Sequence, residues 1–414
     1  MTDPTARSLF RNCALVDGSA PEPREGIDVL VEGGRIKEVS DGPIQAMGAT
    51  EFDLNGRSLM PGLIDCHAHP CLTQLKLAGL EDVPLTLMTA QASTILRGML
   101  NRGFTTIRDA AGGDWGLKEA VRSGHIAGPR LFISGRALSQ TGGHGDFRRR
   151  TDDSVPCSCG NALHFTTRIA DGVDQVRQAA RDELRRGADQ IKVMVSGGVA
   201  SPNDPLENCQ YSAGELRAIV DEATTWNTYV LAHAYTSAAI MHAVRNGVRS
   251  IEHANLIDAE AAALVAEKHA YVVPTLVTYD ALERLGKQLG MTEAMLGKLA
   301  RVRSFGLGSI EICKTAGVRM GFGTDLLGET HDEQSREFLI RAEVQAPHEV
   351  IDSATRINAE ILNRTGELGV IAVGARADLL VVDGNPLNDL GLLQDQGKHL
   401  LVIMKDGAFH KNLL

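Results

Sequence analysis

The sequence lacks the features that would place the protein in a membrane, on a nucleic acid or outside the cell. No run of about 18 apolar residues is present to span a bilayer. The opening MTDPTARSLFRNCALVDGSA has no apolar core of the length that a secretory signal needs, so we expect a cytoplasmic protein. An excess of basic charge is also missing, and the net charge of -10 argues against a nucleic acid or an anionic membrane as partner.

Cysteine is too sparse for a disulfide framework. The seven cysteines are an odd number scattered over 414 residues, so we expect mostly reduced thiols. Cys157 and Cys159 fit either a metal site or a loop with incidental thiols, and no second pair lies nearby. A phosphate-binding G-x-x-x-x-G-K-[ST] loop, a fixed-period repeat and a low-complexity linker are absent as well.

What the sequence does contain is a series of short β-branched or aliphatic runs separated by helical patterns, which is typical of parallel βα units. The eight runs cover residues 59–68, 104–110, 130–135, 190–198, 229–234, 249–254, 270–276 and 319–325. Between them, residues 170–188 place Val173, Val176, Ala180 and Leu184 on one buried helical stripe. Eight such units predict the α/β class and a closed (β/α)₈ barrel of the TIM type.

The two ends of the chain predict a second, smaller domain. Residues 26–40 alternate around Gly33 and Gly34 as a hairpin, and residues 377–386 and 399–407 read as further short strands. A chain of 414 residues also exceeds the usual size of a single core. We therefore predict a small β-sandwich domain from residues 1–58 and 366–414, and a barrel over residues 59–365.

A pair of histidines closes the first run. The stretch GLIDCHAHP puts His67 and His69 two residues apart, on one face of a strand. In isolation such a pair fits either metal ligands or a hydrogen-bonded structural pair. Four other ligand-type residues occupy corresponding places near the ends of later runs, namely Lys192, His233, His253 and Asp325. Because the carboxyl ends of barrel strands converge on one mouth, we expect all six side chains to share one cavity.

The chemistry of these side chains favours a divalent metal centre. Four imidazoles and a carboxylate suit zinc, with manganese, iron, cobalt or nickel as alternatives. Lys192 differs, because like charge and desolvation disfavour a buried ammonium beside metal ions. It can reach solvent, pair with an acid at the mouth, or react with CO₂ to form a carbamate that bridges two ions. Two metals about 3.5 to 4 Å apart can deprotonate a water at neutral pH, and Asp325 can pass that proton to a leaving nitrogen.

Four further residues are candidates for substrate contact. Tyr235 points to the same side of its strand as His233, although plain packing is the alternative. His144 lies in a glycine-rich loop after the third run, where barrels keep binding residues. Arg148, in DFRRR, offers a cation for a carboxylate, but three successive arginines also fit a solvated surface. Gly198 lets the backbone approach a substrate or simply forms a tight turn.

The six ligand-type residues resemble the binuclear-metal branch of the amidohydrolase superfamily. The opening PGLIDCHAHP and the closing GVIAVGARADLLVVDGNP extend the resemblance over nearly the whole chain. The stretches GRALSQTGGHGD, IKVMVSGGVASP, LAHAYT and GFGTDLLGE are most similar to the prolidase-like (Xaa-Pro dipeptidase) and imidazolonepropionase-like group.

This resemblance implies the role of each residue in the site. His67, His69 and Asp325 would hold the first metal, His233 and His253 the second, and a carboxylated Lys192 would bridge them. His144 and Tyr235 match positions credited with carbonyl and carboxylate contacts.

The resemblance also implies the reaction and its alternatives. The expected substrate is a dipeptide with proline or a similar residue at its C-terminal position, cleaved at its amide bond. The alternatives are an amidase of N-acyl or aryl-amide amino acids such as ochratoxin-like toxins, an amidase of cyclic amides, and a catalytically silent barrel used for binding or assembly. Barrels of this group often assemble, so a homo-oligomer is expected.

Overall fold

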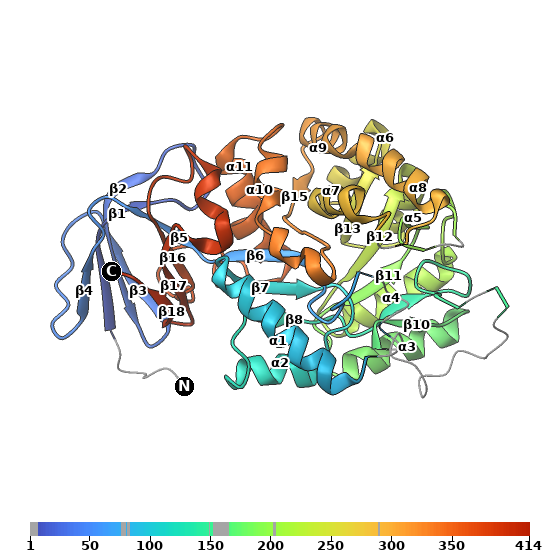
Figure 1. The fold of residues 1–414 in the computed structure, drawn as a ribbon, viewed down its shortest axis with the longest axis horizontal. Coiled ribbons are helices and arrows are strands. Elements are labelled where there is room, and N and C mark those ends of the chain that lie inside the picture. The colour runs from blue at the N-terminus through green and yellow to red at the C-terminus, as the bar shows by residue number, and fades with distance from the viewer. Residues whose placement is uncertain are drawn as a thin grey trace.

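The fold consists of a barrel and a β domain at one end of it (Figure 1). The computed structural model describes residues 7–75, 80, 83–148, 150–151, 165–201, 204–288 and 290–414. The barrel strands are β6 (Leu63–Ala68), β7 (Phe104–Asp109), β8 (Arg130–Phe132), β11 (Ile191–Met194), β12 (Val230–Thr236), β13 (Ser250–Leu256), β14 (Tyr271–Val273) and β15 (Arg319–Met320). They correspond to the eight runs expected from the sequence.

The barrel is closed by backbone hydrogen bonds. Strands β6 to β8 pair in parallel, as do β11 to β15. The N–H of Cys66 donates to the carbonyl of Phe322 at 2.8 Å, which joins β6 to the segment after β15. The N–H of Asp189 donates to the carbonyl of Ile133 at 2.7 Å, which joins the segments beside β8 and β11. Short strands β9 (Ala137–Ser139) and β10 (Thr167–Ile169) extend the sheet beside β11. The α/β barrel predicted from the sequence is confirmed.

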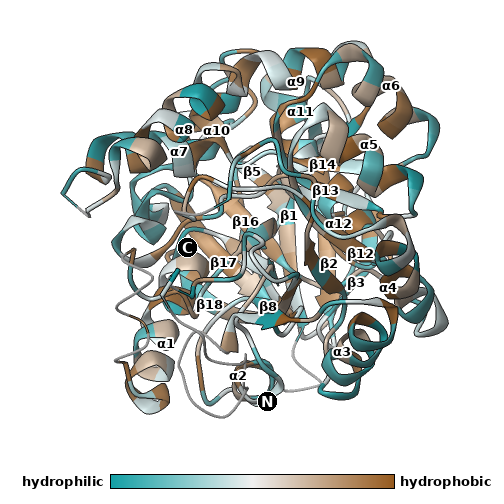
Figure 2. Cartoon of the chain, turned by 90° about the vertical axis from the view of Figure 1, so that its right-hand side faces the viewer, coloured by the Kyte–Doolittle hydropathy of each residue, from teal (hydrophilic) through white to brown (hydrophobic). Residues whose placement is uncertain are grey.

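Helices form a ring around these strands (Figure 2). They are α1 (Leu85–Asn101), α2 (Trp115–Arg122), α3 (Val173–Arg185), α4 (Ala213–Thr225), α5 (Ser237–Arg245), α6 (Ala259–Glu267), α7 (Leu276–Leu285), α8 (Glu293–Ser304), α9 (Gly306–Thr315), α10 (Arg336–Arg341), α11 (Pro347–Asp352) and α12 (Asn358–Ile361). Apolar residues of the helices and of the strands share a buried core. In α3, Val176, Ala180 and Leu184 are buried as expected, but Val173 is 42% exposed because it begins the helix, ahead of the first packed turn. Within the described part of the chain, no helix is long and apolar enough to cross a membrane.

The β domain is built from both ends of the chain, as predicted. Its strands are β1 (Arg7–Leu15), β2 (Arg24–Glu32), β3 (Arg35–Ser40), β4 (Thr50–Asp53), β5 (Ser58–Pro61), β16 (Leu379–Val382), β17 (Leu400–Lys405) and β18 (Ala408–Asn412). They form one sheet that folds over at β1, whose first half pairs with β4 and whose last residues pair with β5. The rings of Phe52 and Phe409 meet at 5.5 Å between the two halves, and apolar side chains of both halves share one core.

The β domain also packs against the barrel. Leu380 and Leu400 belong to the same apolar cluster as Leu96 and Phe104 of the barrel. At Gly103 an added Cβ would lie 2.8 Å from the side chain of Leu400. The close approach of the two domains at this point therefore depends on a residue without a side chain. This packing holds the start of β7 in place and thereby one wall of the barrel.

Candidate metal centre and active site

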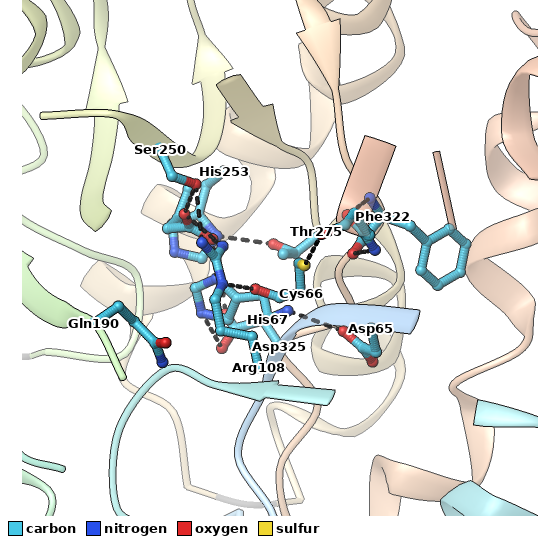
Figure 3. A network of polar contacts seen from close by, with 12 residues as sticks. Asp65, Cys66, His67, Arg108, Gln190, Ser250, His253, Thr275, Phe322 and Asp325 are labelled. Atoms are coloured by element: carbon cyan, nitrogen blue, oxygen red, sulfur yellow. Dashed lines mark hydrogen bonds and ion pairs between the residues drawn. The ribbon is translucent and has the colours of Figure 1, made fainter. Parts of the chain in front are cut away.

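The side chains expected to bind metal converge at the carboxyl ends of the barrel strands. Figure 3 shows three of them, His67, His253 and Asp325. Ligand atoms of His67, His253 and Asp325 all lie within 4.8 Å of one another. Nε2 of His69 lies 3.1 Å from Oδ1 of Asp325. The imidazole of His233 lies 4.7 Å from that of His253, measured between ring centres. The structure therefore brings four imidazoles and one carboxylate into a single cluster.

Lys192 lies at the same end of the barrel. Its side chain is buried, and burial lowers the pKa of its ammonium to about 8, although the nearby carboxylates of Glu252 and Asp325 oppose that shift. No hydrogen bond or ion pair holds the ammonium in the part of the chain that the structure describes. Of the three alternatives for Lys192, exposure to solvent is wrong, because the side chain is buried in the barrel.

The first two histidines each use Nδ1 for an acceptor of the chain. His67 donates from Nδ1 to Oε2 of Glu252 at 2.6 Å, and His69 donates from Nδ1 to the carbonyl of Ala111 at 3.1 Å. Their Nε2 atoms face Asp325 instead, at 3.5 Å for His67 and 3.1 Å for His69. When Nδ1 carries the proton and donates it to the chain, Nε2 keeps its lone pair and the ring orientation is set. Nε2 can then bind a metal ion from a defined direction.

The other two histidines follow the same rule with different nitrogens. His233 donates from Nε2 to the carbonyl of Gly197 at 3.2 Å, which leaves Nδ1. Nδ1 of His253 lies 2.8 Å from the hydroxyl of Thr275, which leaves Nε2. Burial lowers the pKa of both His233 and His253 well below the usual value, so both rings are neutral.

Asp325 completes a donor set that fits divalent metal ions. Burial raises the pKa of its carboxyl, but His67 and His69 outweigh burial and hold this pKa well below its usual range. Zinc and similar ions bind the ionised form of a carboxylate and the neutral form of an imidazole, and each of the four rings has one nitrogen whose partner is fixed by the chain and one directed elsewhere.

The backbone is strained at two of the expected ligands, His253 and Asp325. His253, Ala254 and Asp325 have φ angles of 73°, 54° and 52°, which are unfavourable for residues with a side chain. Asp325 is held there by its N–H, which donates to the carbonyl of His67 at 2.8 Å. The hydroxyl of Thr324 donates to Asp65 at 2.7 Å and fixes the same turn. This backbone strain lowers the stability of the fold, but it directs the side chains of His253 and Asp325 toward the expected metal site.

A buried ion pair lies beneath the metal ligands, and the sequence analysis missed it. Arg108 of β7 donates to both carboxylate oxygens of Glu252 at 2.9 and 2.8 Å, and Ser250 donates to Oε1 at 2.6 Å. Burial raises the pKa of Glu252, but Arg108 and His67 outweigh it and hold this pKa below its usual range. The sequence signal was a charged residue within each of two buried strands, in TTIRDA and SIEHAN.

His144 and Tyr235 border the cluster, as expected of substrate contacts. The ring of His144 stacks on His233 with centres 4.2 Å apart, and its Nδ1 lies 2.8 Å from the hydroxyl of Ser201. Tyr235 stacks on His253 at 5.2 Å. Burial raises the pKa of Tyr235, so its hydroxyl keeps a proton to donate.

The structure gives the other two candidates different partners. Arg148 forms an ion pair with Asp146, with nitrogen to oxygen distances of 2.8 and 2.6 Å. The N–H of Gly198 donates to Oδ2 of Asp204 at 3.1 Å, and an added Cβ at Gly198 would lie 2.0 Å from the His144 ring. Gly198 therefore makes room for His144. Arg149, Cys157 and Cys159 lie outside the described residues.

Comparison with known proteins agrees with this architecture. Residues 58–408 match the model of the amidohydrolase family. A crystal structure of an amidohydrolase superposes with a TM-score of 0.96 at 55% identity, covering 98% of this chain and 99% of that one. A prolidase complexed with N-methylphosphonate-L-proline superposes with a TM-score of 0.95 at 50% identity, covering 98% of this chain and 100% of that one. Ochratoxinase of Aspergillus niger is 32% identical over 392 residues, which are 90% of this chain and 79% of that protein. The chain is a hydrolytic enzyme and belongs to the amidohydrolase family.

Proposed function

We propose that the protein hydrolyses the amide bond of dipeptides whose C-terminal residue is proline or a similar residue. The observation that carries this proposal is the cluster of four imidazoles around Asp325, each with one ring nitrogen already fixed by the chain. The likeness to a prolidase complexed with a proline phosphonate supports the choice of substrate.

Members of this family generally use a metal centre, and the donor set here fits two ions. His67, His69 and Asp325 would hold the first ion and His233 and His253 the second, and Lys192 would serve as a further ligand once carboxylated by CO₂. Zinc is the ion we expect. When bound, the ions supply a polarised carbonyl and a water of lowered pKa.

The chain's own residues do the remaining work. Oδ1 of Asp325 lies against the Nε2 atoms of His67 and His69, so Oδ2 is the atom that takes a proton from the attacking water. Asp325 then delivers this proton to the leaving nitrogen, which amide cleavage requires. Tyr235 donates its hydroxyl hydrogen to the carbonyl oxygen, where negative charge develops. His144, stacked on His233, is the second side chain that binds the substrate.

A second candidate is the hydrolysis of N-acyl or aryl-amide amino acids, including ochratoxin-like toxins. The 32% identity with ochratoxinase over 90% of the chain favours it. Cyclic amides are a weaker alternative, since no separate observation supports them. A catalytically silent barrel would be expected to have lost ligand residues, whereas this sequence retains all six.

A substrate panel tests the proposal. Purified protein, loaded with zinc in bicarbonate, is incubated with dipeptides ending in proline, arginine or a hydrophobic residue, with ochratoxin A and with a cyclic amide. The released amino acids are measured by mass spectrometry, and the Asp325→Asn variant purified in parallel controls for contaminating peptidases. Turnover of Xaa-Pro dipeptides supports the proposal, preference for ochratoxin A favours the second candidate, and no turnover of any substrate contradicts both.

Three expectations from the sequence stay predictions. They are a cytoplasmic location, assembly into a homo-oligomer, and domain boundaries at residues 1–58 with 366–414 and 59–365. Size-exclusion chromatography with light scattering tests the second of these.

A further inference from the structure

A buried chain of polar groups connects two residues of the site. Nδ1 of His253 lies 2.8 Å from the hydroxyl of Thr275, which lies 3.4 Å from the hydroxyl of Tyr279. Tyr279 in turn donates to the hydroxyl of Tyr235 at 3.0 Å. All four side chains are buried. The proposed function uses the two ends of this chain and leaves the two middle residues without a role.

Helix α7 presents both middle residues to the site. Thr275 precedes the helix and Tyr279 follows four residues later, so both lie on one face. Thr275 occupies the N-cap position, yet its side chain makes no capping hydrogen bond. Glu337 of α10 caps the helix instead, because its Oε2 accepts a hydrogen bond from the N–H of Val277 at 2.7 Å. The hydroxyl of Thr275 is therefore free to face His253 (Figure 3).

The direction of each hydrogen bond follows from the state of His253. If Nε2 of His253 faces a metal ion, Nδ1 carries the proton and donates to Thr275. Each hydroxyl has a single hydrogen, so Thr275 donates onward to Tyr279, and Tyr279 donates to Tyr235. The oxygen of Tyr235 is then occupied as an acceptor. Its own hydrogen has no remaining acceptor within this chain of groups and is therefore available to a substrate.

Apolar packing keeps water away from these groups. Tyr235 and Tyr279 belong to a cluster that also contains Val199, Leu206 and Leu299. The cluster covers the tyrosines from the side of the loop after β11 and from α8. In such surroundings a hydroxyl has no solvent partner to turn toward, so the internal donor determines its orientation.

We propose that Tyr279 is a positioning residue that orients the Tyr235 hydroxyl as a hydrogen-bond donor to the carbonyl oxygen of the substrate. Thr275 links this orientation to the metal-binding state of His253. The proposal rests on the proposed function, because it needs an amide carbonyl beside Tyr235. It concerns the transition state, in which negative charge on that oxygen makes a fixed donor most valuable.

A double-mutant cycle tests the proposal on the metal-loaded enzyme. We expect Tyr235→Phe to lower kcat by roughly a hundredfold or more, the usual effect of losing an oxyanion donor. Tyr279→Phe removes one orienting hydrogen bond and should lower kcat by about five- to tenfold, with KM within about twofold of wild type. In the double variant, the second substitution should have no further effect, because Tyr279 acts only through Tyr235.

Binding of a tetrahedral mimic provides a second readout. N-methylphosphonate-L-proline is the probe, and we expect Tyr279→Phe to weaken its binding by about five- to tenfold while proline binding stays unchanged. Tyr271→Phe is the matched control, because Tyr271 lies at the amino end of β14, at the opposite end of the barrel. Metal content and thermal unfolding are measured for every variant.

The outcomes separate the inference from the proposed function. A Tyr279→Phe enzyme with wild-type kcat and mimic affinity would overturn the inference and leave the proposed function intact. The inference would also be overturned if Tyr279→Phe lowered kcat by the same factor in the wild-type enzyme and in the Tyr235→Phe variant. No wild-type turnover of any amide would remove the proposed function and the inference together.

Discussion

His67 donates from Nδ1 to Oε2 of Glu252 across 2.6 Å, at a place where neither side chain is exposed. Arg108 balances the charge of Glu252 with two hydrogen bonds. The carboxylate thus fixes both the tautomer and the direction of His67 before any ion arrives. Outer partners of this kind raise the basicity of the ring and pre-arrange the ligand.

The first prediction concerns this pair. We expect Glu252→Gln to reduce zinc affinity by roughly 10- to 100-fold, because the amide can turn its N–H₂ group toward His67 and no longer stabilises the proton on Nδ1. Competition with a chelator measures the affinity. Glu222→Gln is the matched control, since Glu222 is also held by arginines, Arg177 and Arg181, but on the outer helix α4. Equal zinc affinity in Glu252→Gln and wild type would show that Glu252 has only a structural role.

The second prediction separates proton transfer from metal binding. Asp325→Asn should leave the fold and much of the metal in place while lowering kcat by roughly 10²- to 10⁴-fold, because an amide cannot accept and deliver a proton. Zinc content by mass spectrometry and kcat are measured on the same sample. A variant that keeps the wild-type rate would exclude Asp325 as the proton shuttle.

The third prediction concerns the support of His144. Gly198→Ala would put a Cβ 2.0 Å from the His144 ring, so the ring must move away from His233. We expect kcat/KM to fall by roughly 10- to 100-fold, as when a contact residue is misplaced. Gly297→Ala in α8 is the control, because nothing lies within 4 Å of the added Cβ. If His144→Ala and Gly198→Ala lower kcat/KM additively in the double variant, the two residues do not act together.

The fourth prediction concerns stability and pH. Burial raises the pKa of Glu337 to about 8 from an ordinary value of 4.5. Between these two pH values the folded protein holds this proton and the unfolded chain has lost it, so the stability that Glu337 contributes falls as pH rises. Glu337→Gln stays neutral and keeps an oxygen for the Val277 N–H. At pH 8 we therefore expect its free energy of unfolding to exceed that of wild type by at least about 1 kcal/mol.

Urea unfolding at pH 5, 6.5 and 8 measures this difference. The exposed Glu311, on α9, provides the control Glu311→Gln, which should follow the wild-type pH dependence. The same pH dependence in Glu337→Gln as in wild type would show that the buried carboxyl is already ionised across this range.

The sequence predicted those parts of the molecule that depend on local pattern. The eight runs define the barrel because buried parallel strands need continuous apolar stretches, and the ligands stand out because His, Lys and Asp are rare at the ends of such runs. The sheet of the β domain folds over at β1 because β1 pairs with both β4 and β5. The sequence pattern does not specify these two pairings.

Residues that act through long-range contacts could not be predicted in the same way. Glu252 precedes His253, and strand alternation would send one of them outward. The φ of 73° at His253 breaks the alternation, so both reach the centre. Tyr279 lies on an ordinary helix, and its role depends on contact with Tyr235, 44 residues away in the sequence. Only the folded chain brings these residues together.

The most direct test of the account is a zinc titration of the metal-free protein, in bicarbonate, followed through the hydrolysis of an Xaa-Pro dipeptide. The account predicts no hydrolysis without metal, a rise in rate with bound zinc, and a plateau near two ions per chain. Hydrolysis at full rate by metal-free protein, or a chain that retains no zinc, would contradict it.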